Sequence, residues 1–127
     1  LLAVDPNWKQ SYAERPDNPA MFSDFISLNN DKITKFFTNL DEESDNIDEV
    51  VEFIGLMKLS SNASGVFLKQ YLAMEGLSKK SVEKLKIIGF LEDLRKSGVN
   101  ISIFNVKDRW CEIDTTQDLE VARKIFA

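Results

Sequence analysis

The chain has 127 residues, which suits one domain with one hydrophobic core. Apolar residues make up 43% of it and charged residues 29%, a balance typical of a folded protein rather than a disordered one. The net charge of -5 leaves no uniformly basic surface for a phosphate backbone, so we expect no binding to nucleic acid.

Two residue counts restrict the kinds of catalytic and metal site that this chain can form. The chain has no histidine, which excludes a Ser-His-Asp triad, a Cys-His pair and histidine-ligated zinc built from this chain alone. Cys111 is the only cysteine, so no internal disulfide forms, and we expect a cytoplasmic protein. The apolar runs are far shorter than the roughly 20 residues that span a bilayer, so we expect no membrane contact.

The first predicted element is a short apolar strand over residues 1–4, which ends at Asp5 because Pro6 disfavours helical geometry in the residue before it. Ligands bind at the carboxyl ends of strands in open α/β sheets, so Asp5 is a candidate substrate contact. The alternative is that Asp5 only forms the turn. The chain opens inside an apolar run without an initiator methionine, and we therefore expect a fragment of a larger protein.

Residues 7–19 are mostly polar and predict a loop or a broken helix. Trp8 and Tyr12 are four positions apart, and in a helix they would share a face with Arg15. Such a face predicts an aromatic and cationic wall for a small zwitterionic ligand. The alternative is a surface loop packed by its own aromatic side chains.

The middle of the chain predicts a β-hairpin and a long strand. Residues 22–28 and 32–37 flank a turn at residues 29–31, whose Asn and Asp side chains tolerate positive φ. The acidic residues 41–45 predict a solvated connector. The apolar run over residues 50–59 predicts a strand, with a glycine where another backbone or a ligand comes close.

Two helices and a further strand are expected next. Residues 60–75 predict a helix that Gly76 ends, and residues 81–97 predict a second helix with apolar side chains every three positions. Gly98 stands at the position that commonly follows a helix. Alternating apolar residues over 99–106 then predict a strand.

A short strand over residues 110–114 and a helix through Phe126 complete the predicted elements. Thr115, with Asp118 three positions later, forms a capping box that begins this helix. Strands and helices alternate toward the end of the chain, which predicts an α/β fold rather than a helical bundle or a barrel.

Glu112 and Asp114 carry the clearest chemical signal that comes from spacing. They are two positions apart on a predicted strand, so their side chains emerge on the same face. Mg²⁺ is commonly held by one or two carboxylates together with substrate phosphates, so Asp114 needs only a second carboxylate from elsewhere. The alternative is that Asp114 only caps the following helix.

Three runs of residues form a recognisable set, namely Trp110–Ala122, Glu52–Ser60, and Val4-Asp5 followed by Trp8, Tyr12 and Arg15. The first matches the pattern W-x-E-I-D-T-x-x-D-L-x-x-A and the second E-x-x-G-x-x-K-x-S. Together they resemble the nucleotidyltransferase superfamily, which includes sugar-1-phosphate nucleotidyltransferases. The combination is most similar to the cytidylyltransferases of phosphocholine and phosphonate metabolism.

This resemblance implies a magnesium-dependent transfer of a nucleotidyl group, expected to come from CTP. The acceptor would be a phosphate or phosphonate such as phosphocholine or 2-aminoethylphosphonate, and pyrophosphate would be released. The resemblance implies that Asp114 is catalytic and binds Mg²⁺ and that Glu52 contacts the acceptor, while Glu112, on the same face as Asp114, is expected either to contact the acceptor or to support the metal ligand. Many relatives have a lysine shortly after the hairpin that this chain lacks, and Arg15 or Lys58 is expected to supply the cationic contact in its place. The alternatives are a sugar-1-phosphate nucleotidyltransferase and a noncatalytic α/β binding or assembly module.

For the fold, the resemblance implies a three-layer α/β/α sandwich with a mixed, mainly parallel sheet. Residues 1–127 would form the C-terminal half of a Rossmann-like nucleotidyltransferase domain, the half that binds the acceptor and contributes a metal ligand. The N-terminal half, which binds the nucleotide, is absent from the chain and would be its partner. We therefore expect the chain alone to be inactive.

Overall fold

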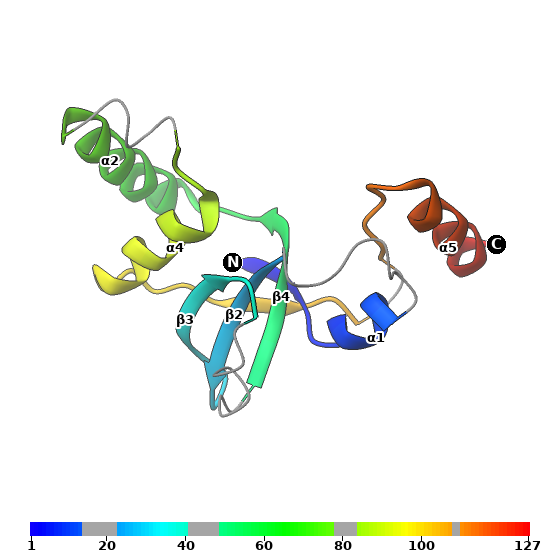
Figure 1. Cartoon of the computed structure of the whole chain (residues 1–127). Helices are drawn as coiled ribbons and strands as arrows, with labels where there is room; N and C mark the ends of the chain where they lie inside the picture. The colour runs from blue at the N-terminus through cyan, green and yellow to red at the C-terminus, as the bar shows by residue number, and fades with distance from the viewer. Residues whose placement is uncertain (14–22, 41–48, 78–83, 108–109) are drawn as a thin grey trace.

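The computed structural model describes residues 1–13, 23–40, 49–77, 84–107 and 110–127 (Figure 1). Those residues form five strands and four helices, in the order β1 (Leu2–Asp5), α1 (Trp8–Ala13), β2 (Asp24–Asn29), β3 (Lys32–Thr38), β4 (Glu49–Met57), α2 (Ser61–Leu77), α4 (Ile87–Lys96), β5 (Ile103–Asn105) and α5 (Thr116–Phe126). The predicted α/β class is confirmed. The predicted connector at residues 41–45 lies outside the described residues.

The five strands form one mixed sheet in the order β3-β2-β4-β1-β5. The pairs β3–β2, β2–β4 and β4–β1 are antiparallel, and only β1–β5 is parallel. The expectation of a mainly parallel sheet is therefore wrong for this chain. The reason is local, because the tight hairpin makes β2 and β3 antiparallel, and β4 runs opposite to both of its neighbours.

The predicted β-hairpin is confirmed. Asn30 and Asp31 occupy the two turn positions with φ values of 48° and 62°. Two consecutive residues with positive φ match the hairpin turn whose twist suits the flanking strands. Gly55 in β4 also has a positive φ, of 77°, which explains a glycine within this long strand.

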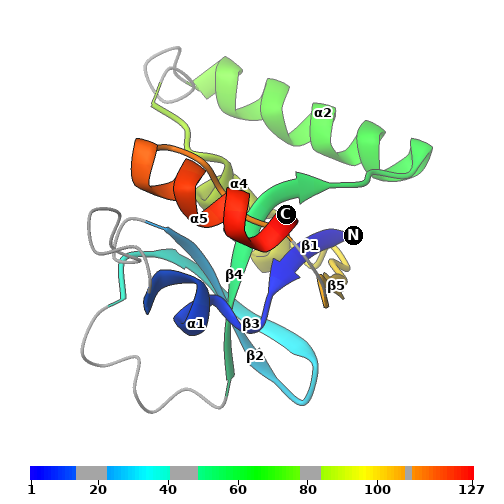
Figure 2. The ribbon, with the colours of Figure 1, turned by 90° about the vertical axis from the view of Figure 1, so that its right-hand side faces the viewer.

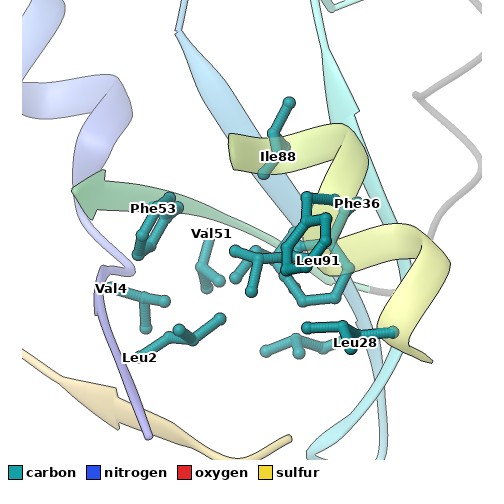
Figure 3. Close-up of a cluster of buried hydrophobic side chains, with 11 residues drawn as sticks. Leu2, Val4, Leu28, Phe36, Val51, Phe53, Ile88 and Leu91 are labelled. Atoms are coloured by element: carbon teal, nitrogen blue, oxygen red, sulfur yellow. The ribbon is translucent and has the colours of Figure 1, made fainter. Parts of the chain in front are cut away.

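One face of the sheet packs against α4 and carries the hydrophobic core (Figure 3). Side chains from β1, β2, β3 and β4 meet apolar side chains of α4 there, and all are at most 5% exposed. The cluster consists of Leu2, Val4, Ile26, Leu28, Phe36, Val51, Phe53, Ile88, Phe90, Leu91 and Leu94. This burial of apolar surface is the main source of stability for the fold.

The two central helices differ from the prediction at their ends. Gly76 lies inside α2, which extends to Leu77, so the expected stop at Gly76 is wrong. Helix α4 begins at Ile87 rather than at residue 81, because Lys86 has extended backbone angles, φ -85° and ψ 140°. Residues 81–83 lie outside the described residues.

The expected end of α4 is confirmed. Gly98 has a φ of 83°, and its N–H donates to the carbonyl of Arg95 at 2.9 Å. The N–H of Val99 donates to the carbonyl of Leu94 at 3.0 Å. This pair of bonds is the Schellman arrangement that a glycine after a helix supports.

The last third of the chain holds less strand than expected. The strand predicted over residues 99–106 is limited to β5, and residues 110–114 form no strand, so that prediction is wrong. Helix α5 does begin with the predicted capping box between Thr115 and Asp118. None of the helices in the described parts of the chain is long and apolar enough to cross a bilayer.

Candidate functional site

The face of the sheet opposite to the core is polar at its centre. Asp5 of β1, Glu52 of β4 and Phe25 of β2 lie in register on adjacent strands, so their side chains share one face. Helix α1 covers this face, while α4 covers the other (Figure 1). Asp5 and Glu52 are both buried, being 4% and 3% exposed. Two buried carboxylates side by side are unusual and need hydrogen-bond partners.

Among the described residues, three groups donate hydrogen bonds to Asp5. The backbone N–H of Asn7 donates to its Oδ1 at 2.7 Å, and the Ser11 hydroxyl donates to its Oδ2 at 3.1 Å. The indole Nε1–H of Trp110 donates to the same Oδ2 at 3.0 Å. Asp5 therefore joins the end of β1 to α1 and to the segment that carries Glu112. These contacts explain its burial, and direct contact between Asp5 and a substrate stays a prediction.

Tyr12 connects α1 to Glu52. Its hydroxyl group donates to Oε1 of Glu52 at 2.5 Å and lies 2.6 Å from the Ser23 hydroxyl. The other oxygen of Glu52, Oε2, is buried, and none of the described residues donates a hydrogen bond to it. The sequence predicted a loop or a broken helix over residues 7–19, and residues 8–13 form the helix α1. Trp8 and Tyr12 therefore both reach the sheet from the same helix.

Burial and neighbouring groups change the pKa values of both Glu52 and Tyr12. Burial raises the pKa of Glu52 above its usual value, and the nearby carboxylates of Glu112 and Asp5 raise it further. Hydrogen bonds from Tyr12 and Ser23 act in the opposite direction but do not cancel the rise. The pKa of the Tyr12 hydroxyl is also raised, first by burial and then by its bond to Glu52. Tyr12 therefore stays protonated and keeps donating to Glu52.

An open pocket of about 500 Å³ lies beside Glu52, between β4, the beginning of α4 and the segment of residues 110–114. We call it the carboxylate pocket. Its described lining includes the four carboxylate side chains of Asp24, Glu52, Glu112 and Asp114, with Lys86 and Trp110. Glu112 and Asp114 are exposed, whereas Glu52 forms the buried floor. The sequence-predicted trio of Glu52, Glu112 and Asp114 is thus brought together, although no strand holds the last two.

Asp114 precedes α5 but does not cap it. The side chain of Thr115 accepts the N–H of Asp118, and the carboxylate of Asp118 accepts the N–H groups of Thr115 and Asp114, at 2.8 and 3.1 Å. Thr115 and Asp118, rather than Asp114, therefore cap the beginning of α5. This arrangement fixes the backbone of Asp114 and leaves its side chain on the wall of the carboxylate pocket.

The other predicted contact residues lie elsewhere. Trp8 is buried, donates from Nε1 to the carbonyl of Val50 at 2.9 Å and packs edge-on against Phe25, so its ring serves packing. Lys58 follows β4 and does not line the carboxylate pocket. Arg15 lies outside the described residues.

Sequence reasoning missed two charged residues of the pocket lining, Asp24 and Lys86. Asp24 begins β2, and burial raises the pKa of its carboxyl group while the charge of Lys86 lowers it. The predicted helix over residues 81–97 places Lys86 in a helix interior, where it has no special role. No short-range signal marks this boundary of α4, because the apolar repeat of the sequence continues through Leu85, which packs against the core.

The donor types of the carboxylate pocket suit Mg²⁺, which prefers oxygen ligands and keeps several waters. Glu112 and Asp114 are exposed carboxylates on one wall. Within the described ranges, no three His, Cys, Asp or Glu side chains are grouped closely enough to hold a metal ion. A magnesium ion here would therefore need further ligands from substrate phosphates or from another part of the protein.

The chain is similar to the CTP:phosphoglutamine cytidylyltransferase of Campylobacter jejuni, with 27% identity over 128 residues. The similarity covers 94% of this chain and 47% of the relative, so the chain spans about half the length of that protein. No family model matches the chain, and no solved structure matches it significantly. The similarity supports a distant nucleotidyltransferase-like relationship.

Proposed function

We propose that the protein containing this chain transfers a cytidylyl group from CTP to a small phosphate or phosphonate acceptor and releases pyrophosphate. The carboxylate pocket carries this proposal, because it gathers the three acidic residues whose motifs match the cytidylyltransferases. The similarity to a cytidylyltransferase supports the same reaction class. The relative's name specifies phosphoglutamine, and phosphocholine or 2-aminoethylphosphonate are the acceptors that we propose to test first.

In this proposal Asp114 is the catalytic residue of the chain and holds Mg²⁺, with Glu112 beside it. Bound Mg²⁺ would neutralise charge on the transferred phosphoryl group. The hydrogen bond from the backbone N–H of Asp114 to Asp118 positions this residue at the beginning of α5. Glu52 forms the floor on which the acceptor lies, and its oxygen Oε1 is held by Tyr12. Catalysis of this kind depends on positioning and electrostatics, and it needs no histidine.

The other parts of the reaction belong to the rest of the protein. We propose that this chain is the acceptor-binding and metal-contributing part of a cytoplasmic nucleotidyltransferase whose other half binds CTP. Helices on both faces of the sheet support a three-layer α/β/α domain of the Rossmann-like type. The sheet of this chain is mainly antiparallel, so a larger parallel part would have to come from the other half.

The test is pyrophosphate release by the intact protein with CTP and each acceptor, with and without Mg²⁺. We expect Asp114→Asn to lower kcat by about 100-fold or more, because the substitution removes the ligand charge and keeps the size. Asp31→Asn, in the exposed turn of the hairpin, is the matched control and should keep full activity. Near-normal pyrophosphate release by the Asp114→Asn protein would remove Asp114 from the metal role. Absence of release by the unaltered protein with every acceptor would favour a noncatalytic module.

A further inference from the structure

Asp5 is buried at the junction of three parts of the chain, and it lines neither of the two cavities that its hydrogen-bond partners line. One is the carboxylate pocket, and the other is a cavity of about 230 Å³ that α1, residues 110–112 and α5 line. Among the described hydrogen-bond partners of Asp5, Trp110 is the one that reaches the carboxylate pocket. Any effect of Asp5 on a molecule bound in this pocket therefore passes through a neighbouring group.

Residues 110–114 carry the exposed carboxylates of the pocket wall but belong to no helix or strand, so no ladder of backbone hydrogen bonds fixes them to the sheet. Asp118 accepts the two N–H groups that precede α5, but Asp118 is itself part of α5, so these bonds shape the helix end without joining it to the sheet. The indole Nε1–H of Trp110 donates to Oδ2 of Asp5 and so joins the segment to β1 across 105 residues. The place of the wall relative to the sheet therefore depends on this bond.

We propose that Asp5 is a positioning residue that acts on the site through Trp110. Its carboxylate fixes the indole, and the fixed indole sets where Asp114 lies relative to the sheet. Asp5 is also the register partner of Glu52, so the positions of the wall and the floor of the carboxylate pocket depend on the same two strands. The proposal rests on the proposed function, and it gives Asp5 a role other than the direct substrate contact that its place at the end of β1 predicts.

A carboxylate suits this role because each of its described hydrogen-bond partners, Asn7, Ser11 and Trp110, is a donor. An ionised carboxylate only accepts hydrogen bonds, and its bonds are about twice as strong as those between neutral groups. Asparagine has the same size but presents an N–H₂ group, so a donor would face a donor. In a reaction that depends on positioning, a displacement of about 1 Å can lower the rate about 100-fold, so loss of the indole bond is measurable in the rate.

The experiment measures pyrophosphate release by the intact protein over a range of Mg²⁺ concentrations. Trp110→Phe removes the indole N–H and keeps an aromatic ring, and Asp5→Asn keeps the size of the accepting side chain. We expect each variant to lower kcat about tenfold and to raise the Mg²⁺ concentration for half-maximal rate about tenfold, and Asp5→Asn to change the acceptor KM by less than about twofold. Ser11→Ala is the matched control, because it removes another donor to the same carboxylate and leaves the indole bond in place. It should change kcat and the Mg²⁺ requirement by less than about twofold.

The double variant decides whether the two residues act through one bond. Once Asp5→Asn has broken this bond, adding Trp110→Phe should lower the activity by less than about twofold more. Losses that multiply, or an Asp5→Asn protein with the Mg²⁺ requirement of the unaltered one, would overturn the proposal. A raised acceptor KM in that protein at an unchanged Mg²⁺ requirement would instead assign Asp5 to direct substrate contact.

Nuclear magnetic resonance provides a readout that needs no turnover. The indole N–H signal of Trp110 is the one absent from the spectrum of the Trp110→Phe protein, and its relaxation reports how firmly the indole is held. We expect an ordered indole in the unaltered protein and in Ser11→Ala, and a mobile one in Asp5→Asn. An indole that stays ordered in Asp5→Asn would overturn the positioning role whether or not the protein releases pyrophosphate. An indole that Asp5→Asn makes mobile, in a protein that releases none with any acceptor, would reject the proposed reaction alone.

Discussion

The two faces of the sheet bury side chains by different means. Under α4, contact is almost wholly apolar, and the residues come from an alternating pattern along each strand (Figure 3). Under α1, the centre of the face is a pair of carboxylates, Asp5 and Glu52, held by hydrogen bonds from distant parts of the chain. Strand β4 contributes to both faces, because Val51 and Phe53 point to the core while Glu52 points away from it.

The difference indicates a division of roles. The apolar face provides the free energy of folding, since apolar burial is the dominant favourable contribution. The polar face buries charged groups, which is destabilising unless every atom is paired. Helices α1 and α5 lie toward the viewer in Figure 2, and both border a cavity of about 230 Å³ that residues 110–112 also line. The comparison therefore separates a stabilising apolar face from a polar face that carries the residues we propose for substrate binding.

The largest effect is expected from the apolar face. Phe90 is 1% exposed and its ring centroid lies 4.5 Å from that of Phe67. Phe90→Ala should lower the free energy of unfolding by about 3–5 kcal/mol, because a buried ring is lost and a cavity remains. Chemical denaturation measures this loss. Phe104→Ala at an exposed position is the control and should change it by less than about 0.5 kcal/mol. Equal losses for the two variants would contradict the assignment of the core.

A smaller loss is expected from the polar face. Asp5→Asn places an amide N–H₂ group among three donors, so at least one of them loses its acceptor. We expect a loss of about 2 kcal/mol in unfolding free energy, together with a change in the fluorescence of Trp110 in a Trp8→Phe background. Asp31→Asn in the exposed turn serves as the control. Full stability with unchanged Trp110 emission would mean that Asp5 does not hold this segment.

The smallest effect has the opposite sign and depends on pH. The pKa of Glu52 is raised in the folded protein, so its proton stabilises the fold at low pH, and this contribution is lost as pH rises above the usual glutamate range. Glu52→Gln removes that dependence. At pH 7 the variant should therefore be more stable than the unaltered chain by about 1 kcal/mol, and near pH 4 the two should be equal. Denaturation curves at both pH values measure the difference.

Glu92 on α4 provides the matched comparison for Glu52. Its carboxylate accepts the N–H of Phe36 at 3.0 Å and pairs with Arg95 at 2.8 Å, and these contacts lower its pKa. The stability that it contributes is present above the usual glutamate pKa and is lost as pH falls through the lowered pKa of the folded protein, so Glu92→Gln should destabilise the chain at pH 7 and progressively less as the pH falls below the usual glutamate range. The same pH dependence for both variants would mean that the two carboxylates do not occupy opposite kinds of environment.

Motifs that act over three or four residues make several elements of this chain predictable. The hairpin follows from the Asn and Asp residues of its turn, and the beginning of α5 follows from Thr115 and Asp118. The Schellman ending at Gly98 is of the same kind. The strand expected at residues 110–114 does not form, because alternation alone provides no neighbouring strand, and the segment is held instead through the indole of Trp110.

Composition and short-range pattern are sufficient for the α/β class, the apolar side chains of the core and the acidic identity of the site. The mainly antiparallel sheet, the three bonds on Asp5 and the place of Lys86 in the same pocket as Glu52 emerge only from the folded chain. The cause is distance along the chain. Trp110 is 105 residues from Asp5, and Tyr12 is 40 residues from Glu52. Residues so far apart in the sequence meet only in the folded chain, where the strands of the sheet bring them together.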